Sequence, residues 1–236
     1  MTEEHQRRSS KGGYSAKTGA SGWITGRSCA RLVGMNLRKT SVWFHLLDVL
    51  LNIVIIVAIV AMIRTFLVSP FEVEGSSMVD TLEDREYIII NKLAYHIGKP
   101  DRGDVVVFRP PNNPSKHYVK RVIGIPEDTI SLRDGKVYLQ PAGSDEEFEL
   151  FEPYLNATNQ GRTYQQPPSG GNTDEIRYFV PEGHYFLMGD NRQGSLDSRS
   201  FSPSPYVDED AIKGKVWFVA LPIDKIHALA PPAYDL

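Results

Sequence analysis

The chain has 236 residues, a formal net charge of −3 and one cysteine, which is enough length for one sizeable folded domain with extensions. A single cysteine excludes an intramolecular disulfide, and the six histidines never stand four residues apart, so a structural zinc site is not expected. The first 45 residues hold eight Lys/Arg against two acids. Such a basic tail is typical of nucleic-acid binding or of the cytoplasmic flank of a membrane anchor.

The segment that follows favours the membrane. Residues 1–41 are rich in Ser, Gly, Lys and Arg without an apolar period, which predicts a disordered cytoplasmic tail and no nucleic-acid partner. Residues 42–64 form the predicted span, in which the apolar run from Val42 to Ile63 (VWFHLLDVLLNIVIIVAIVAMI) would be about 33 Å long as a helix and Arg64 closes it. A buried core helix and a cleaved secretory signal are the alternatives, but no small-x-small site follows closely. We therefore expect a retained single-pass anchor in the plasma membrane, with residues 65–236 outside the cytoplasm.

After the anchor, short apolar runs rich in Val, Ile, Tyr and Phe alternate with turns, and no long helical period appears. Asp134-Gly135 between two such runs predicts a hairpin. The fold expected is mainly β, a partly closed antiparallel β-barrel-like catalytic domain behind a single N-terminal transmembrane helix. A polar insertion is expected at about residues 140–175. The strand-like runs are Tyr87–Asn91, Asp104–Phe108, Tyr118–Ile125, Thr129–Leu132, Lys136–Leu139, Tyr178–Val180, His184–Met188 and Lys215–Val219.

The stretch EGSSMVDTL at residues 74–82 raises the question of a nucleophilic serine, which needs a base. His117 and His184 could serve in a triad, but neither lies in an informative context. Lys120 lies inside a strand-like run next to Arg121, so strict alternation turns one of the two inward. A buried lysine that loses its proton is a general base, whereas a lysine on a solvated edge strand has no such role.

The polar segment GDNRQGSLDSR at residues 189–199 follows an apolar run directly and is a second candidate for a site-building loop. Together with the anchor, Ser-Met followed by Thr-Leu, RGDVVVF and YVKRVIG, this segment resembles bacterial type I signal peptidase (leader peptidase). The motifs stand in the family's order from about Arg64 to Arg199.

The resemblance implies a Ser–Lys dyad of Ser77 and Lys120 that cuts signal peptides from exported preproteins after small-x-small motifs. It implies no metal and no cofactor. An apolar rim near Phe71 would meet the lipid bilayer. The resemblance assigns Ser195 to orienting the lysine, by accepting one of its hydrogens. The other supporting residues that it implies are Gly75, Arg121, Asp190, Asp197 and Arg199, and the substrate-binding residues are Phe71, Val73, Met78 and Val119.

Four positions depart from the family pattern. One branch of the family has an oxyanion-hole serine at the position of Gly75, whereas Asp80, Glu127 and Ser202 replace the usual proline, glycine and glycine. Two other classes stay open as alternatives. A self-cleaving repressor also uses Ser and Lys but has neither the anchor nor the Gly-Asp-Asn-Arg motif, and a non-catalytic anchored β domain would not need Ser77, Lys120 and Ser195 together.

Overall fold

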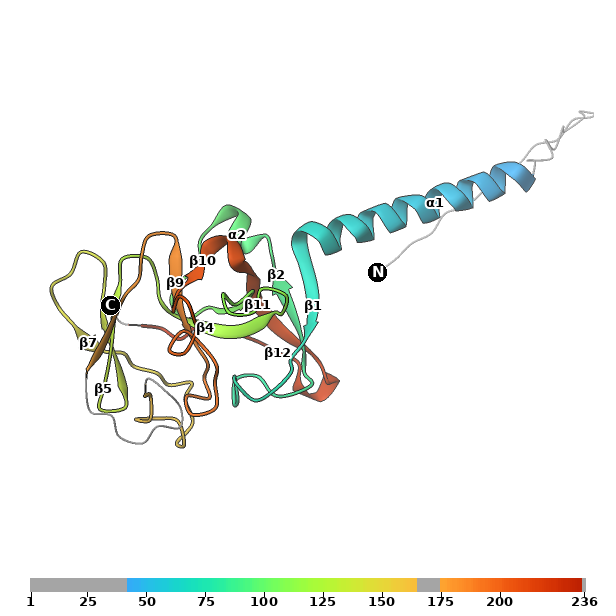
Figure 1. Ribbon diagram of the computed structural model, residues 1–236. Coiled ribbons are helices and arrows are strands. Elements are labelled where there is room, and N and C mark those ends of the chain that lie inside the picture. Colours follow the sequence, from blue (N-terminus) through green and yellow to red (C-terminus); the bar gives the residue numbers. More distant parts are fainter. Residues whose placement is uncertain (1–41, 165–174, 235–236) are drawn as a thin grey trace, which may run out of the picture. The chain divides into compact units, whose positions relative to one another are not determined.

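The computed structural model describes residues 42–164 and 175–234 of the chain (Figure 1). The predicted disordered tail, residues 1–41, lies outside the described residues, and so do residues 165–174 of the predicted insertion and the last two residues of the chain.

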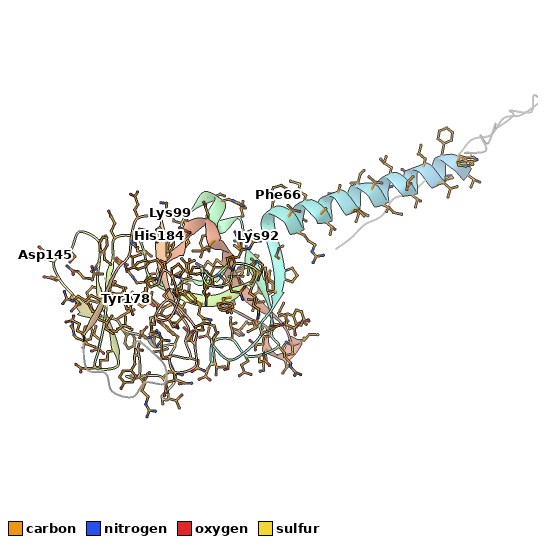
Figure 2. The ribbon with its side chains drawn as sticks, viewed as in Figure 1. Phe66, Lys92, Lys99, Asp145, Tyr178 and His184 are labelled. Carbon is orange, nitrogen blue, oxygen red and sulfur yellow. The ribbon has the colours of Figure 1, made fainter. Side chains whose placement is uncertain are left out.

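An apolar helix begins the described chain. Helix α1 (Val42–Met62) continues through a π-helical turn, η1 (Ile63–Leu67), and no residue of either is buried. The 26 residues from Val42 to Leu67 are long and apolar enough to cross a bilayer. Large apolar side chains project from all sides of α1 (Figure 2). A helix that is apolar all round and unburied is expected of a membrane span.

The larger sheet has eight antiparallel strands in the described part of the chain, in the order β1-β2-β11-β3-β4-β9-β10, with β12 paired to β11 (Figure 1). Its path starts at β1 and ends at β10 without joining them, so the curled sheet is only partly closed. This confirms the expected fold class. The strands are β1 (Val68–Glu72), β2 (Tyr87–Asn91), β3 (Val105–Phe108), β4 (Tyr118–Gly124), β9 (His184–Met188), β10 (Val207–Asp208), β11 (Ile212–Leu221) and β12 (His227–Ala228).

A smaller antiparallel sheet has the order β7-β6-β5-β8. Its central hairpin turns at Asp134 and Gly135, whose φ angles of 52° and 73° are both positive, as a tight two-residue hairpin requires. The strands are β5 (Thr129–Arg133), β6 (Lys136–Gln140), β7 (Phe148–Glu149) and β8 (Ile176–Phe179), and the remaining helical turns are α2 (Ala94–Ile97), η2 (Glu209–Ala211) and η3 (Ile223–Lys225).

Three buried apolar clusters hold these elements together. The first cluster joins the smaller sheet to β9. The third cluster lies between β3, β4, β9, β10 and the start of β11. The second cluster packs β2, β3 and β11 against side chains of the loop between β1 and β2. That packing fixes the loop that contains the candidate serine. The second cluster consists of Val73, Met78, Leu82, Ile88, Ile90, Val105, Val107, Val216 and Val219.

Candidate active site

Ser77 lies in the loop of residues 73–86, which joins β1 to β2. The loop is closed at its base, where the backbone N–H of Val73 donates to the carbonyl of Glu86 at 2.8 Å. Below the serine, Met78 is only 1% exposed and packs in the second cluster. The serine is therefore presented by a loop whose base and underside are both fixed.

Gly75 shapes the chain just before the serine. Its φ of +90° lies in a region that side chains disfavour, although a Cβ there would meet no atom within 4 Å. The glycine is thus required by backbone conformation and not by space. The Gly75 N–H donates to the carboxylate of Asp84 at 2.7 Å, which ties the turn to the far side of the loop.

Lys120 reaches the serine from the centre of β4. Its Nζ lies 2.7 Å from Ser77 Oγ and 2.8 Å from the carbonyl oxygen of Val119, and the residue is 3% exposed. Burial lowers the pKa of Lys120 to about 8, against the opposing effect of the Asp197 and Asp190 carboxylates. A lysine with this pKa has a substantial neutral fraction just above physiological pH and can accept a proton from a neighbouring hydroxyl.

Arg121 is buried as deeply as Lys120, which strand alternation did not predict. Its guanidinium forms two hydrogen bonds with Asp190, at 2.9 and 2.7 Å, and a third with the carbonyl of Gly103 at 2.8 Å. Both faces of β4 are covered, since Lys120 and Arg121 are each 3% exposed. The centroid of the Tyr154 ring lies 3.9 Å from the Arg121 guanidinium carbon. The buried charge is stable because its donors are paired.

The loop of residues 189–199 closes the site. The carboxylate of Asp197 accepts two hydrogen bonds from the Arg199 side chain, at 2.8 and 2.7 Å, and one from the N–H of Gly189. Burial alone would raise the pKa of Asp197, but Arg199 and these hydrogen bonds hold it below its usual range. The loop also contacts the serine directly, since the N–H of Asn191 donates to the carbonyl of Ser77 at 3.1 Å.

Ser195 is buried in this loop, but its contacts differ from the expectation. In the described residues Lys120 Nζ forms hydrogen bonds with Ser77 Oγ and with the carbonyl oxygen of Val119, whereas Ser195 Oγ is buried and has no hydrogen-bond partner of good geometry. The Ser195 hydroxyl does lie near enough to Asp197 to help lower that carboxyl's pKa. The carbonyl of Val119 accepts one hydrogen bond from the Lys120 amine, and the expected role of Ser195 in orienting that amine stays a prediction.

Gly189 is a site residue that the sequence did not single out. A Cβ on Gly189 would lie 2.2 Å from Ser195 Oγ and 2.5 Å from the carbonyl oxygen of Ser77. Only a glycine allows the serine loop and the 189–199 loop to approach this closely. In the sequence, the only indication that Gly189 belongs to the site was its position directly after the apolar run that forms β9.

A cleft of about 320 Å³ runs along Ser77 and Lys120. Three of the expected substrate-binding residues, Phe71, Val73 and Val119, line it. Met78 does not, because its side chain is buried in the core beneath the cleft, so its assignment to substrate binding is corrected. The lining also includes residues that the sequence did not indicate, chiefly His117 and Leu196.

In the described part of the chain, neither candidate histidine is hydrogen-bonded to Ser77. His117 packs against Phe71, with ring centroids 5.3 Å apart, and His184 Nε2 lies 3.0 Å from a carboxylate oxygen of Asp208 on the neighbouring strand. No cluster of three His, Cys, Asp or Glu side chains that could hold a metal occurs among the residues described. The basic group beside Ser77 is the Lys120 amine.

Comparison with known families identifies the chain's relatives. The family model "Signal peptidase, peptidase S26" matches residues 46–221, which include every side chain of the site above. The chain belongs to this signal peptidase family. The match begins within α1 and ends with β11, so it covers the apolar helix as well as both loops of the site.

Several bacterial signal peptidases are similar to this family member over most of their length. Signal peptidase I S of Bacillus subtilis (strain 168) is 40% identical over 63% of this chain and 75% of its own. Signal peptidase I of Bacillus amyloliquefaciens is 36% identical over 80% of this chain and 95% of its own. A crystal structure of a signal peptidase I from Enterococcus faecalis V583 aligns with a TM-score of 0.38 and 30% identity, covering 50% of this chain and 96% of that one.

One departure from the family pattern has a structural consequence. Glu127, expected from the resemblance to replace a glycine, has a φ of +70°, which lies in the left-handed region. Its N–H donates to the carbonyl of Val180 at 2.8 Å, which connects the turn before β5 to the end of β8. A glycine would adopt this backbone conformation freely, whereas glutamate adopts it here at some strain.

Proposed function

We propose that this protein removes signal peptides from exported preproteins, with Ser77 as the nucleophile and Lys120 as the general base. One observation carries the proposal: a buried lysine with a lowered pKa lies 2.7 Å from the hydroxyl of a serine on a cleft wall. Family membership and the relatives named signal peptidase I support the same activity.

In the proposed reaction, neutral Lys120 takes the proton of Ser77 Oγ as that oxygen attacks the scissile carbonyl carbon. The C–N bond then breaks, the lysine ammonium protonates the leaving amine, and an acyl-enzyme remains on Ser77. Water, deprotonated by the same lysine, attacks the ester carbonyl carbon. As the C–O bond to Ser77 breaks, the lysine ammonium returns that proton to Ser77 Oγ, and the released carboxylic acid ionises to the carboxylate product. Since Gly75 brings no hydroxyl, we assign the oxyanion to the backbone N–H of Ser77.

The supporting residues act on the base and its loop in this proposal. The Arg121–Asp190 and Asp197–Arg199 pairs form a buried layer of matched charges behind Lys120. Because each arginine is paired with a carboxylate, the layer lets the lysine lose its proton without a strong field of either sign. Ser195 is a positioning residue beside Gly189 in this scheme.

The substrate would lie along the cleft. The apolar walls formed by Phe71, Val73 and Val119 suit short apolar side chains, which supports cleavage after small-x-small motifs. Exposed apolar residues near the end of the anchor, Phe66 (Figure 2) and Leu67, support contact with the same bilayer that holds the signal peptide.

The proposed topology follows from charge and hydropathy. Residues 1–41 form a cytoplasmic tail, residues 42–64 a single membrane span and residues 65–236 an extracytoplasmic catalytic domain with an insertion at about 140–175. The excess of Lys/Arg before α1 supports this orientation. Neither the self-cleaving repressor class nor a non-catalytic binding domain accounts for the anchor and the Ser77–Lys120 contact together.

A cleavage assay on a model preprotein tests the proposal. The purified protein in detergent should shorten the preprotein at one small-x-small site, and Ser77→Ala should abolish cleavage. Ser76→Ala is the matched control, since the adjacent exposed serine has no lysine partner in the structure. Loss of activity in Ser76→Ala with retention in Ser77→Ala would show that the wrong nucleophile has been assigned.

A further inference from the structure

The segment of residues 148–164, within the polar insertion, contacts the 189–199 loop through an arginine that no mechanism above uses. Arg192 is 0% exposed, and its guanidinium forms a bidentate pair with the Glu152 carboxylate, one bond of which is 2.9 Å long. The same guanidinium donates to Thr163 Oγ1 at 2.8 Å. Two side chains from the insertion thus satisfy one fully buried charge in the loop.

Arg192 also connects the insertion to the backbone of the 189–199 loop near Ser77. Its Nε donates to the carbonyl of Gly189 at 3.0 Å, and its own carbonyl accepts from Arg199 at 2.9 Å. Ser195 and the carbonyl oxygen of Ser77 both lie against Gly189, since a Cβ on this glycine would meet each of them. The insertion is therefore connected to the nucleophile through one side chain and one glycine.

Further contacts run from the same segment to the other charged groups. Arg199 donates to the carbonyl of Tyr164 at 2.9 Å, and the ring of Tyr154 covers the guanidinium of Arg121. The hydroxyl of Tyr154 in turn donates to Glu152 at 2.7 Å. Three buried arginines behind the base are thus held by one segment that is remote from them in sequence.

We propose that residues 148–164 position the 189–199 loop for catalysis, with Glu152 as the key positioning residue through its pair with Arg192. The inference rests on the proposed function, because positioning has meaning only for a working Ser77–Lys120 pair. Glu152 touches no reacting group. It fixes Arg192, and Arg192 fixes the backbone at Gly189, next to which Asn191 holds the carbonyl of Ser77.

Loosening this segment should affect Lys120 in a defined direction. Lys120 is faced by Ser77, by the Asp190 and Asp197 carboxylates and by Arg199, and burial is the largest cause of its lowered pKa. A loop that opens to water reduces that burial, so the pKa of Lys120 should rise towards the value of a solvated lysine. The acid limb of the activity profile would then move to higher pH.

The experiment compares Glu152→Gln and Thr163→Val with a matched control, Glu149→Gln, in the full-length protein. Glu149 lies in the same segment but pairs with Lys136 on the surface, with both side chains nearly half exposed. Both test variants should lower kcat about tenfold with KM within about twofold, because a small misplacement of reacting groups costs rate and not binding. The control should match wild type.

A second measurement is independent of activity. Hydrogen exchange of the backbone amides in residues 189–199, above all Asn191, should be faster in Glu152→Gln than in Glu149→Gln. The proposal would be overturned if both test variants kept the wild-type kcat and the wild-type exchange rates. It would also be overturned if they had a lower melting temperature but an unchanged kcat at assay temperatures well below that melting temperature. Failure of the proposed function would appear instead as preprotein cleavage by the Ser77→Ala variant. The exchange comparison would still test the contact between residues 148–164 and the 189–199 loop.

Discussion

At the scale of single residues, Lys120 decides what the site can do. A lysine amine buried to 3% exposure beside a serine can serve as a base only while it is uncharged, and its environment is built for that state. Two carboxylates that would stabilise its charge are each engaged by an arginine, Asp190 by Arg121 and Asp197 by Arg199. The charges near the amine are thus balanced, and burial is what lowers the pKa of Lys120.

Lys120→Arg should abolish cleavage although the positive charge is kept. A guanidinium stays protonated near neutral pH and cannot take the Ser77 proton. In wild type, kcat/KM should rise with pH through about 8, where the Lys120 amine becomes neutral, and level off above it. The assay is initial cleavage rate of a model preprotein between pH 6 and 10. An active Lys120→Arg variant would refute the dyad.

The same lowered pKa predicts that Lys120 costs stability. Between pH 8 and 10.5 the unfolded chain binds more protons than the folded one, so the free energy of unfolding should rise with pH across that window. Lys120→Met should remove this rise and be more stable than wild type at pH 7 by about 3 kcal/mol. Urea unfolding at pH 7 and pH 10 measures both. Lys116→Met, at an exposed turn position, is the control and should show neither effect.

The residues that sequence reasoning found and missed differ in a physical way. Lys120 was visible because a charge inside an apolar strand is unusual whatever surrounds it. Met78 was misplaced because nothing in the sequence tells which way a loop side chain points. The bond between Lys120 and the carbonyl of Val119 was equally invisible, since backbone acceptors carry no sequence signal.

At the scale of elements, the strands with strong β-branched or aromatic runs were predicted to within a few residues, and the Asp134-Gly135 hairpin was predicted in place. Strand β1 was not. It contains Pro70, which lacks an N–H and argues against a central strand, but β1 lies at the edge of the sheet, where proline is tolerated. The insertion's buried contacts were also unpredictable, because Glu152 and Arg192 are 40 residues apart and lie outside any periodic element.

Gly135→Ala should destabilise the smaller sheet and loosen the segment that follows β7. An added Cβ would lie 2.1 Å from the carbonyl oxygen of Gly161, and the N–H of Thr163 donates to the carbonyl of Gly135 at 2.7 Å. We expect a loss of about 2–3 kcal/mol, beyond the cost of a positive φ alone.

Gly143→Ala provides the matched control for that substitution. Gly143 has the same φ of +73°, but a Cβ there would meet nothing within 4 Å, so only the conformational cost should appear. The difference between the two unfolding free energies, measured by denaturant titration, isolates the clash with Gly161. Equal losses would show that the segment can move away from the hairpin without cost.

At the scale of the whole molecule, the anchor holds the proposed enzyme at the membrane, and the β domain contains the catalytic residues. An exported preprotein reaches the membrane with an apolar signal segment, so a protease whose span ends next to β1 meets that segment close to the bilayer surface. The chain at this junction is held firmly: the N–H of Lys92 donates to the carbonyl of Leu67 at 2.9 Å, and its Nζ lies 3.2 Å from the carbonyl of Arg64 (Figure 2). Basic groups near a helix C-terminus stabilise its free carbonyls.

The orientation of that anchor is open to a direct test. The first 45 residues carry eight Lys/Arg against two acids, and such an excess is retained on the cytoplasmic side of a span. In protoplasts, an added protease should therefore digest the β domain and leave an N-terminal epitope tag protected on a fragment that includes α1. Detergent is the control, because it should expose the tag to the protease as well. A protected β domain with a digested tag would reverse the orientation, and it would also place Ser77 on the wrong side of the membrane for exported substrates.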